Sequence, residues 1–272
     1  MLVLIRGGGD LASGVAIRLH RAGFRVLITE LPQPLVVRRL VSFAEAVYSR
    51  RVSVEGVNAR LVGSFVEGFD VIDRGDIPVL VDPDAQVLSQ LSPDVLIDGR
   101  MTKQPAKYDL GASRLIIGLG PGFIAGENCN AAVETNRGHR LGRVIWGGAT
   151  QSDTGIPEQV LEYTQDRVMR SPVGGVLTVH TEICDHLEPG QLVAEVADSQ
   201  ILAPFRGVLR GILHPGVVVQ PGMKIGDVDP RDDPAYCRQV SDKSLAVAGG
   251  VLEAVLSIPR IRSAYSSQYA PG

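Results

Sequence analysis

Cysteine is scarce in this sequence of 272 residues, which holds only Cys129, Cys184 and Cys237, each more than 50 residues from the next. None belongs to a C-x-x-C pair, and no histidine stands near one at a spacing that suits zinc. The sequence therefore indicates neither a disulfide framework nor a metal site. We interpret the three cysteines as reduced structural thiols, because free cysteine is among the residue types most often buried.

An excess of charge of one sign is also lacking, as are long apolar runs. Lys and Arg number 27 against 30 Asp and Glu, and the basic residues are scattered, which argues against nucleic acid as a partner. The longest uncharged run, 115–126, has only 12 residues, against the roughly 18 to 20 apolar residues of a membrane helix. The first residues do not show the basic segment followed by an apolar segment that is typical of a secretory signal. We therefore expect a cytoplasmic protein that does not bind a membrane.

Aromatic residues are few, at 5% of the chain. Glycine is plentiful, because 31 of the 272 residues are glycine, whereas glycine usually makes up about 7% of a protein. The glycines follow no collagen-like period, so they indicate many tight turns in a globular protein. The chain is longer than the roughly 100 to 200 residues of one domain. We expect a nucleotide-binding domain over residues 1–165, a β domain over 166–232, and a C-terminal helix and tail over 233–272.

The first 30 residues follow the order strand, glycine loop, helix, strand and acidic residue. Residues 2–5 form a short apolar run that suits a buried parallel strand, and the glycine loop 7–9 follows. Apolar residues then recur at three- and four-residue spacing, which predicts a helix over 11–22. Residues 24–29 predict a second buried strand that ends at Glu30.

Further short apolar segments predict more strands of the same sheet. They lie at 77–81, 95–97, 115–117, 131–133 and 143–146. A helix expected over 36–48 and an alternating stretch over 52–62 precede most of them. Buried strands separated by helical segments predict an α/β fold with a Rossmann-like, doubly wound sheet. A C-terminal helix is expected over 242–256, where Gly249-Gly250 implies close packing on another element.

The second half contains an internal repeat at a constant offset of 32 residues. Residues 171–198 and 203–230 are identical at 7 of 28 aligned positions, which include a Pro-Gly turn in each copy. One copy cannot close a core, so two stacked copies predict a small all-β module of the barrel-sandwich-hybrid type. Biotinyl and lipoyl carrier domains resemble this arrangement, but the hairpin between the copies, 198–201, has no lysine. We expect a module for packing or partner contact.

The glycine loop and its surroundings form the first candidate site. Its members are Gly7, Gly8, Gly9, Asp10, Ala12 and Glu30. Gly7, Gly9 and Ala12 match the G-x-G-x-x-G/A spacing of dinucleotide-binding turns, which hold phosphates at a helix mouth. Glu30 stands where a carboxylate accepts hydrogen bonds from ribose hydroxyls, which favours NAD over NADP. The alternative is a glycine turn that serves packing alone.

Three later loops, each after an apolar strand, form the second candidate site. Its members are Asp98, Lys103, Gly118, Gly120, Gly122, Arg137 and His139. Carboxyl ends of parallel strands meet at one edge of a sheet, so we expect these loops to line one pocket. Lys103, Arg137 and His139 would supply positive charge or proton transfer to an anionic ligand, with Asp98 and Glu134 orienting them. The alternative is that the loops are solvated turns.

Several longer stretches, in fixed order over nearly the whole chain, resemble one protein family. They are RGGGDLASGVAIRLHRAGFRV (6–26), FAEAVY (43–48), IPVLVDP (77–83), the D-x-x-x-x-K of 98–103, GLGPGF (118–123), ETNRGHRLGRVI (134–145), GVLRG (207–211) and GGVLEA (249–254). They are similar to motifs of the YqeB-type accessory proteins of selenium-dependent molybdenum hydroxylase systems. The first domain also resembles that of xanthine dehydrogenase accessory proteins. Gly99-Arg100 departs from the family pattern, in which small or apolar residues are expected.

The resemblance implies an accessory protein for the maturation of molybdenum hydroxylases. Such a protein would bind a molybdenum hydroxylase as its client, and either the dinucleotide form of molybdenum cofactor or another nucleotide. The residues themselves leave two other functions open: an NAD-dependent oxidoreductase of unknown substrate, although no Tyr-x-x-x-Lys pair is evident, and a scaffold that only contacts partners. They also leave open whether the chain catalyses a reaction and whether it forms a homo-oligomer.

Overall fold

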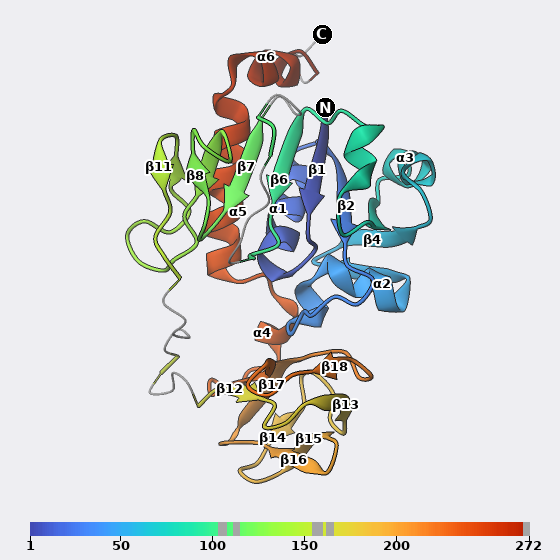
Figure 1. Ribbon diagram of the computed structural model, residues 1–272, viewed down its shortest axis with the longest axis vertical. Helices are drawn as coiled ribbons and strands as arrows, with labels where there is room; N and C mark the ends of the chain where they lie inside the picture. Colours follow the sequence, from blue (N-terminus) through green and yellow to red (C-terminus); the bar gives the residue numbers. More distant parts are fainter. Residues whose placement is uncertain (103–107, 111–114, 154–159, 162–165, 269–272) are drawn as a thin grey trace.

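A large sheet with its helices lies above a smaller, all-β part in the computed structural model (Figure 1). The structure describes residues 1–102, 108–110, 115–153, 160–161 and 166–268. We call the large sheet the main sheet and residues 168–229 the β module. The N-terminus and the last helix lie at the end of the main sheet away from the β module.

The main sheet holds nine strands in the order β10-β9-β7-β6-β1-β2-β5-β4-β3. Its seven middle strands are parallel, and the edge strands β3 and β10 run antiparallel to their neighbours. The strands are β1 (Leu2–Arg6), β2 (Arg25–Glu30), β3 (Arg51–Val54), β4 (Val57–Val62), β5 (Ile77–Val81), β6 (Val95–Asp98), β7 (Ile116–Leu119), β9 (Ala131–Val133) and β10 (Val144–Ile145). Beside it, β8 (Ile124–Ala125) pairs with β11 (Gly148–Ala149).

The helices are few, and several are single turns. They are α1 (Asp10–Arg21), η1 (Arg39–Val41), η2 (Phe43–Glu45), α2 (Ala46–Ser49), α3 (Phe65–Asp73), η3 (Gln86–Ser89), α4 (Ala235–Arg238), α5 (Asp242–Ser257) and α6 (Pro259–Gln268). The hydroxyls of Ser64 and Ser241 cap α3 and α5, because each accepts a backbone N–H of the first turn. The single helix predicted over 36–48 is wrong. Extended backbone at Ser42 separates η1 from η2 and α2.

Both faces of the main sheet are covered, which explains why its central strands are apolar runs without alternation. On one face, Val3 and Val26 belong to a core that α1 and α5 complete, and these two helices pack closely on each other. On the other face, Leu4 and Leu27 pack with Phe65 of α3 and with η3. α5 therefore brings the C-terminal part of the chain into the core of its N-terminal part.

The predicted fold class, a Rossmann-like doubly wound sheet with a barrel-sandwich-hybrid module, is wrong. A doubly wound sheet carries a helix at each crossover, but no helix lies within residues 120–130, which join β7 to β9 by way of β8. Left-handed backbone at Gly120, Gly122 and Gly126 is incompatible with a helix there. α5, from much later in the chain, contacts β7, β9 and β10 instead. The structure is a mixed sheet with several smaller sheets and few helices.

The β module contains two four-stranded sheets, β12-β19-β17-β14 and β16-β15-β13-β18. Its strands are β12 (Val168–Arg170), β13 (Gly175–Val179), β14 (His186–Leu187), β15 (Leu192–Val196), β16 (Ser199–Leu202), β17 (Gly207–Ile212), β18 (Val218–Val219) and β19 (Lys224–Asp229). At the offset of 32 residues, β13, β14 and β15 begin where β17, β18 and β19 begin. The short strand of each copy pairs with the other copy, β14 with β17 and β18 with β13, so each copy completes the other.

The β module docks on the segment between β2 and β3. A Cβ on Gly211 of β17 would come within 2.5 Å of the Val37 carbonyl oxygen, so the two backbones meet directly. The Arg39 Nε donates to a backbone carbonyl of β17 at 2.8 Å, and the Tyr48 ring stacks on His214 with 4.0 Å between centroids. Since the chain begins at the far end of the main sheet, its parallel strands run toward the module (Figure 1). The module therefore faces the edge at which the glycine loop lies.

Within the described part of the chain, no single helix has the length and apolar character to cross a membrane. Two consecutive helical segments, residues 235–257 and 259–267, together have the length and composition of a membrane span, but a bend of 92° separates them. α5, which makes up most of this pair, packs against α1.

The close packing predicted for Gly249-Gly250 holds for one member of the pair. A Cβ on Gly250 would overlap the carbonyl oxygen of Gly142, whereas one on Gly249 would meet nothing within 4 Å. We expect Gly250→Ala to lower the free energy of unfolding by about 1–3 kcal/mol through overpacking. Gly249→Ala, the matched control, should raise it by up to about 1 kcal/mol, because alanine favours a helix. Urea denaturation measures both, and two shifts of the same sign would contradict the packing argument.

Candidate functional site

The glycine turn, residues 7–9, joins β1 to α1 at the edge facing the β module. Gly7 has left-handed backbone with φ +88°, and a Cβ there would lie 3.1 Å from the Arg100 Cα. A Cβ on Gly8 would lie 2.8 Å from the backbone nitrogen of Ala44. At Gly9, which caps α1, a Cβ would make only an ordinary contact of 3.7 Å. Packing therefore demands the first two glycines, while the third borders open space.

Glu30, at the end of β2, holds the glycine turn in place. One carboxylate oxygen accepts the Gly8 N–H at 2.6 Å, and the other accepts the Leu31 N–H at 2.7 Å. Burial raises the pKa of Glu30, and the hydrogen bonds from Leu31 and Gly8 offset part of that rise. Both oxygens thus serve the backbone, and the ribose contact expected for this side chain stays a prediction.

A cavity of about 600 Å³ opens beside the glycine turn, and we call it the turn cavity. Its polar lining from the main sheet side includes Gly7, Gly9, Asp10, Glu30, Arg38 and Arg100. Apolar residues that line it, and that are partly exposed, are Leu31, Leu35 and Met101. The β module contributes Arg210, Lys224 and Asp227. The module thus forms one wall of a cavity whose opposite wall is the glycine turn.

A second cavity, of about 590 Å³, adjoins the first, and we call it the arginine cavity. Its charged lining consists of Asp10, Arg38, Arg137, Arg167, Arg210, Arg231, Asp242 and Lys243. Asp10, Leu11, Arg38 and Arg210 line both cavities. These four residues therefore mark the boundary at which the two cavities meet.

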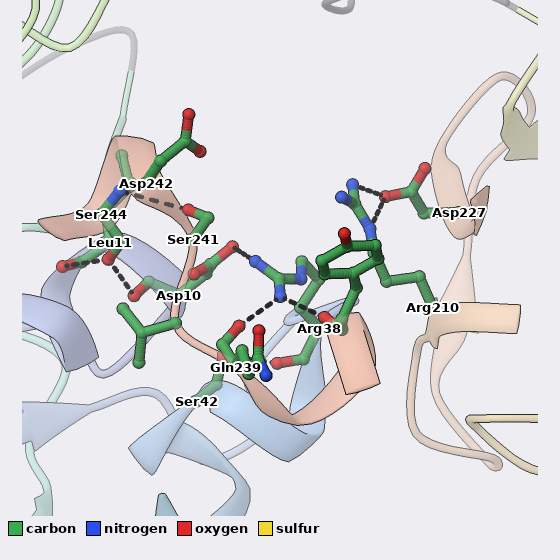
Figure 2. Close-up of polar contacts among 12 residues, drawn as sticks. Asp10, Leu11, Arg38, Ser42, Arg210, Asp227, Gln239, Ser241, Asp242 and Ser244 are labelled. Atoms are coloured by element: carbon green, nitrogen blue, oxygen red, sulfur yellow. Dashed lines mark hydrogen bonds and ion pairs between the residues drawn. The ribbon is translucent and has the colours of Figure 1, made fainter. Parts of the chain in front are cut away.

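Arg38 occupies this boundary (Figure 2), with its side chain only 10% exposed. It donates one hydrogen bond to Asp10 at 2.9 Å and two others to the carbonyl oxygens of Tyr236 and Gln239, at 3.0 and 2.9 Å. The negative charge at the mouth of α1 is thereby compensated. The Arg38 Nε and the second oxygen of Asp10 are buried without a hydrogen-bond partner among the residues that the structure describes.

Three arginines share two buried aspartates on the β module. Asp227 accepts from Arg167 at 2.8 Å and from the Arg210 Nε at 2.9 Å. Asp229 accepts from Arg231 at 2.9 and 2.5 Å and from Arg210 at 3.4 Å. Burial by itself would raise the pKa of Asp229, but the hydrogen bonds from Arg231 and the charge of Arg210 outweigh it and lower that pKa. The cluster thus keeps more positive than negative charge.

Lys224 adds a further positive charge at the start of β19. Lys224 is exposed and lines the turn cavity, yet enough protein surrounds it for desolvation to lower the pKa of its amine. Asp227 opposes this shift, whereas Arg167, Arg210 and Arg170 add to it by repulsion. Desolvation is thus the main cause of the lowered pKa of Lys224, and the nearby arginines are a smaller one.

Of the first candidate site, the structure brings Gly7, Gly9, Asp10 and Glu30 to the turn cavity. Gly8 and Ala12 lie behind them as packing residues. Gly8 abuts Ala44, and the Ala12 Cβ would be 2.8 Å from a Cβ on Gly99.

Among the described members of the second candidate site, only Arg137 lines one of the two cavities, where it pairs with Asp242 at 2.5 and 2.7 Å. Asp98 is buried and accepts hydrogen bonds from Arg100 and Tyr108. Lys103 lies outside the described residues. Glu134, expected to orient the basic residues, accepts backbone N–H groups of its own loop and of residue 151.

The glycines of the later loop line neither of the two cavities, and two of them serve packing. A Cβ on Gly118 would overlap the Phe123 ring, and one on Gly120 would lie 2.5 Å from the Thr135 hydroxyl. Gly122 has left-handed backbone, and His139 is exposed, but neither lines the turn cavity or the arginine cavity. Residues of the three predicted loops meet at Gly120, where a Cβ would also lie 3.0 Å from the Met101 Cε. That these loops line one pocket stays a prediction.

The basic residues of the β module were missed by the sequence analysis, although the repeat carries a signal for them. At the offset of 32, Thr178 and Leu192 of the first copy correspond to Arg210 and Lys224 of the second. Likewise, Ala197 corresponds to the buried Asp229. These strand positions are charged in the second copy alone. This difference indicates that the second copy faces a surface or a ligand that the first copy does not face.

No group of three or more potential metal-ligating side chains occurs in the part of the chain that the structure describes. The charges at the site are mainly guanidinium groups, which do not coordinate metal ions. The arrangement is suited to hold an anion.

The comparisons with known proteins give one sequence relative and several remote structural likenesses. The uncharacterized protein YqeB of Escherichia coli strain K12 is 44% identical over 257 residues, which is 94% of this chain and 48% of that protein. The chain thus spans about half the length of this curated relative. No family model matches the sequence.

The solved structures found are much less similar. An aspartoacylase family protein from Mesorhizobium loti is 11% identical, with 84% of this chain and 83% of that chain covered and a TM-score of 0.26. A succinylglutamate desuccinylase from Silicibacter sp. is 14% identical, with 84% of each chain covered and a TM-score of 0.24. Likenesses of this size carry no argument about the fold or the chemistry of this chain.

The comparisons contradict the predicted membership in a family of molybdenum hydroxylase accessory proteins. The name of the bacterial relative states no such function, and no family model matches the sequence. The prediction of a maturation role is wrong. The client hydroxylase stays a prediction, and none of the names that the comparisons give supports the molybdenum cofactor. None of these names supports NAD, or an NAD-dependent oxidoreductase, either.

Glu30→Gln tests whether both carboxylate oxygens hold the glycine turn. An amide offers one oxygen to two backbone N–H groups, so its NH₂ must face one of them. We expect a loss of about 1–3 kcal/mol in the free energy of unfolding, the cost of an unsatisfied buried donor. In Glu67→Gln, the control, one amide oxygen suffices for the single Gly63 N–H, and the change should stay within about 0.5 kcal/mol. Chemical denaturation at pH 7 compares the two, and an equal effect would contradict the role of Glu30.

Proposed function

We propose that the chain binds a small phosphate-bearing molecule of nucleotide size between the glycine turn and the β module. The observation that carries this proposal is the excess of positive charge at that place. Among the described residues that line the two cavities, eight side chains are basic and four are acidic, in a chain whose formal net charge is -3. Asp98 and Asp229 do not line the cavities, but they pair with the lining residues Arg100 and Arg231. When these two aspartates are added to the four acidic side chains, the basic side chains are still more numerous.

The lining of the turn cavity supports a ligand with two chemically different ends. Gly9 and Asp10 begin α1, whose first N–H groups and dipole favour a phosphate. Arg210 and Lys224 approach the same cavity from the β module, so the phosphate would be held from opposite sides. Leu35 provides an exposed apolar wall that suits a planar base.

The proposal concerns binding, and it assigns no chemical step to the chain. The predicted ribose contact of Glu30 is part of it, since that carboxylate borders the turn cavity. The cytoplasmic location stays the prediction made from the sequence. The scaffold hypothesis is the competing one, and it expects no small molecule in these cavities.

Lys224→Gln measures the contribution of the module to ligand binding. With AMP as the probe in isothermal titration calorimetry, we expect about tenfold weaker binding, because one charge-assisted contact is lost. Arg206→Gln is the matched control. Arg206 is a highly exposed cation of the same module that lies outside both cavities, so AMP affinity should not change. Absence of AMP binding to the unaltered chain would contradict the proposed function.

The pH dependence of AMP binding gives a second measurement. Because the pKa of Lys224 is lowered, its positive charge is lost at a lower pH than that of an ordinary lysine. AMP affinity should therefore fall as the pH rises through this lowered pKa. In Lys224→Arg the charge persists, so the affinity should stay level over that range. Identical pH profiles for the two proteins would show that Lys224 does not contact the ligand.

A further inference from the structure

Cys184 and Cys237 come from different parts of the structure and meet at one backbone atom. The Leu209 carbonyl oxygen of β17 accepts the Cys184 N–H at 2.9 Å and the Cys237 thiol at 3.6 Å. Cys184 lies between β13 and β14 of the β module, whereas Cys237 belongs to α4, which lies between the module and the main sheet (Figure 1). We propose that these two cysteines form a reversible disulfide that fastens the β module to α4.

The two thiols interact with each other as well as with Leu209. Burial raises the pKa of the Cys237 thiol, and its hydrogen bond with the Cys184 side chain raises that pKa further. Cys237 is buried, whereas Cys184 is partly exposed. A reagent in solution therefore reaches Cys184 first, and Cys237 is the neighbour that can complete a disulfide. For this pair, the proposal departs from the interpretation of the cysteines as reduced structural thiols.

The backbone at Cys184 indicates that its side chain has a purpose. Its φ of +88° lies in the left-handed region, which glycine adopts freely and residues with a Cβ disfavour. The equivalent residue of the second copy, 32 positions later, is Gly216, with φ +85°. The Gly216 N–H donates to the Leu177 carbonyl at 2.8 Å, just as Cys184 donates to Leu209. The two turns therefore share one backbone conformation, and only the first carries a side chain there.

The surroundings of the two equivalent turns differ. A Cβ on Gly216 would meet nothing within 4 Å among the described residues, so a side chain there would gain no contact. In the first copy, the side chain at this position meets the Cys237 thiol of α4. Contact with a second thiol is thus what offsets the cost of cysteine at a position that favours glycine.

The disulfide forms by exchange with a small disulfide, such as oxidised glutathione. The Cys184 thiolate attacks that disulfide, which releases one thiolate and leaves a mixed disulfide on Cys184. The Cys237 thiolate then attacks the Cys184 sulfur and displaces the second thiolate. The two cysteines lose two electrons, which the reagent gains, and the protons of the two cysteine thiols pass to the released thiolates.

The disulfide would act on the site through α4. Tyr236, which precedes Cys237, accepts a hydrogen bond from Arg38 at 3.0 Å with its carbonyl oxygen. α4 contacts both β17 of the module and η1 next to Arg38. A covalent bond at Cys237 would therefore hold in place a carbonyl that binds Arg38. The inference goes beyond the proposed function and does not depend on it, since it requires no ligand.

Incubation with oxidised glutathione tests this inference. In the unaltered chain, the three free thiols should fall to one, that of Cys129, and peptide mapping should find Cys184 joined to Cys237. The oxidised chain should melt at least about 5 °C above the reduced chain, because the bond constrains the unfolded state. Cys129→Ala, the control, should show the same rise, whereas Cys237→Ala should show none.

Cys184→Gly separates a disulfide from a packing role. This variant gives the first turn the residue of the second, so its reduced form should melt no lower than the reduced unaltered chain. A lower melting temperature would show that the reduced thiol serves packing and would overturn the inference. Three thiols that persist in the unaltered chain would also overturn it, as would a glutathione adduct that remains on Cys184. The last two outcomes are measured on the unaltered chain, so they do not depend on the folding of a variant.

Discussion

The arrangement of the site depends on one buried cation, the guanidinium of Arg38. It lies between the mouth of α1, the α4 region and the β module, and it compensates Asp10 while binding two backbone carbonyls near α4. A buried charge is tolerated only when it is paired and hydrogen-bonded, so these partners hold the mouth of α1 and the α4 region together. Val37 and Arg39, which flank Arg38 in the sequence, make the docking contacts with β17. The same short segment therefore positions the module and closes the boundary between the cavities.

The β module combines a symmetric backbone with asymmetric charge. Corresponding strands of its two copies begin 32 residues apart in the sequence, and each copy gives a short strand to the other. Arg210, Lys224, Asp227 and Asp229 all belong to the second copy, which faces the main sheet. The first copy has uncharged residues at three of the corresponding positions, with Glu195 at the fourth. Duplication thus supplied a stable framework, and the charges followed the surroundings of each copy.

Much of the secondary structure was predictable, because continuous apolar runs identify strands that are covered on both faces. β5 and β9 coincide with their predicted bounds, and α5 differs from its own by one residue. The helix expected over 36–48 failed where Ser42 is extended, a conformation that tertiary contacts impose on that segment. The doubly wound fold also requires a helix between β7 and β9. That expectation is wrong for a local reason, because the glycines of this connection adopt left-handed backbone.

The sequence by itself determined the glycine turn, the acidic residue that ends β2, the repeat, and the absence of a cysteine or histidine cluster. These features depend on local spacing or on composition, both of which can be read along the chain. Only the tertiary structure decided that Gly7, Arg38 and Arg210 share one site. Residues from three distant stretches meet there because backbone contacts dock the module at the carboxyl edge of the sheet. No local pattern records such a meeting, since buried charge is stable only with partners that the fold provides.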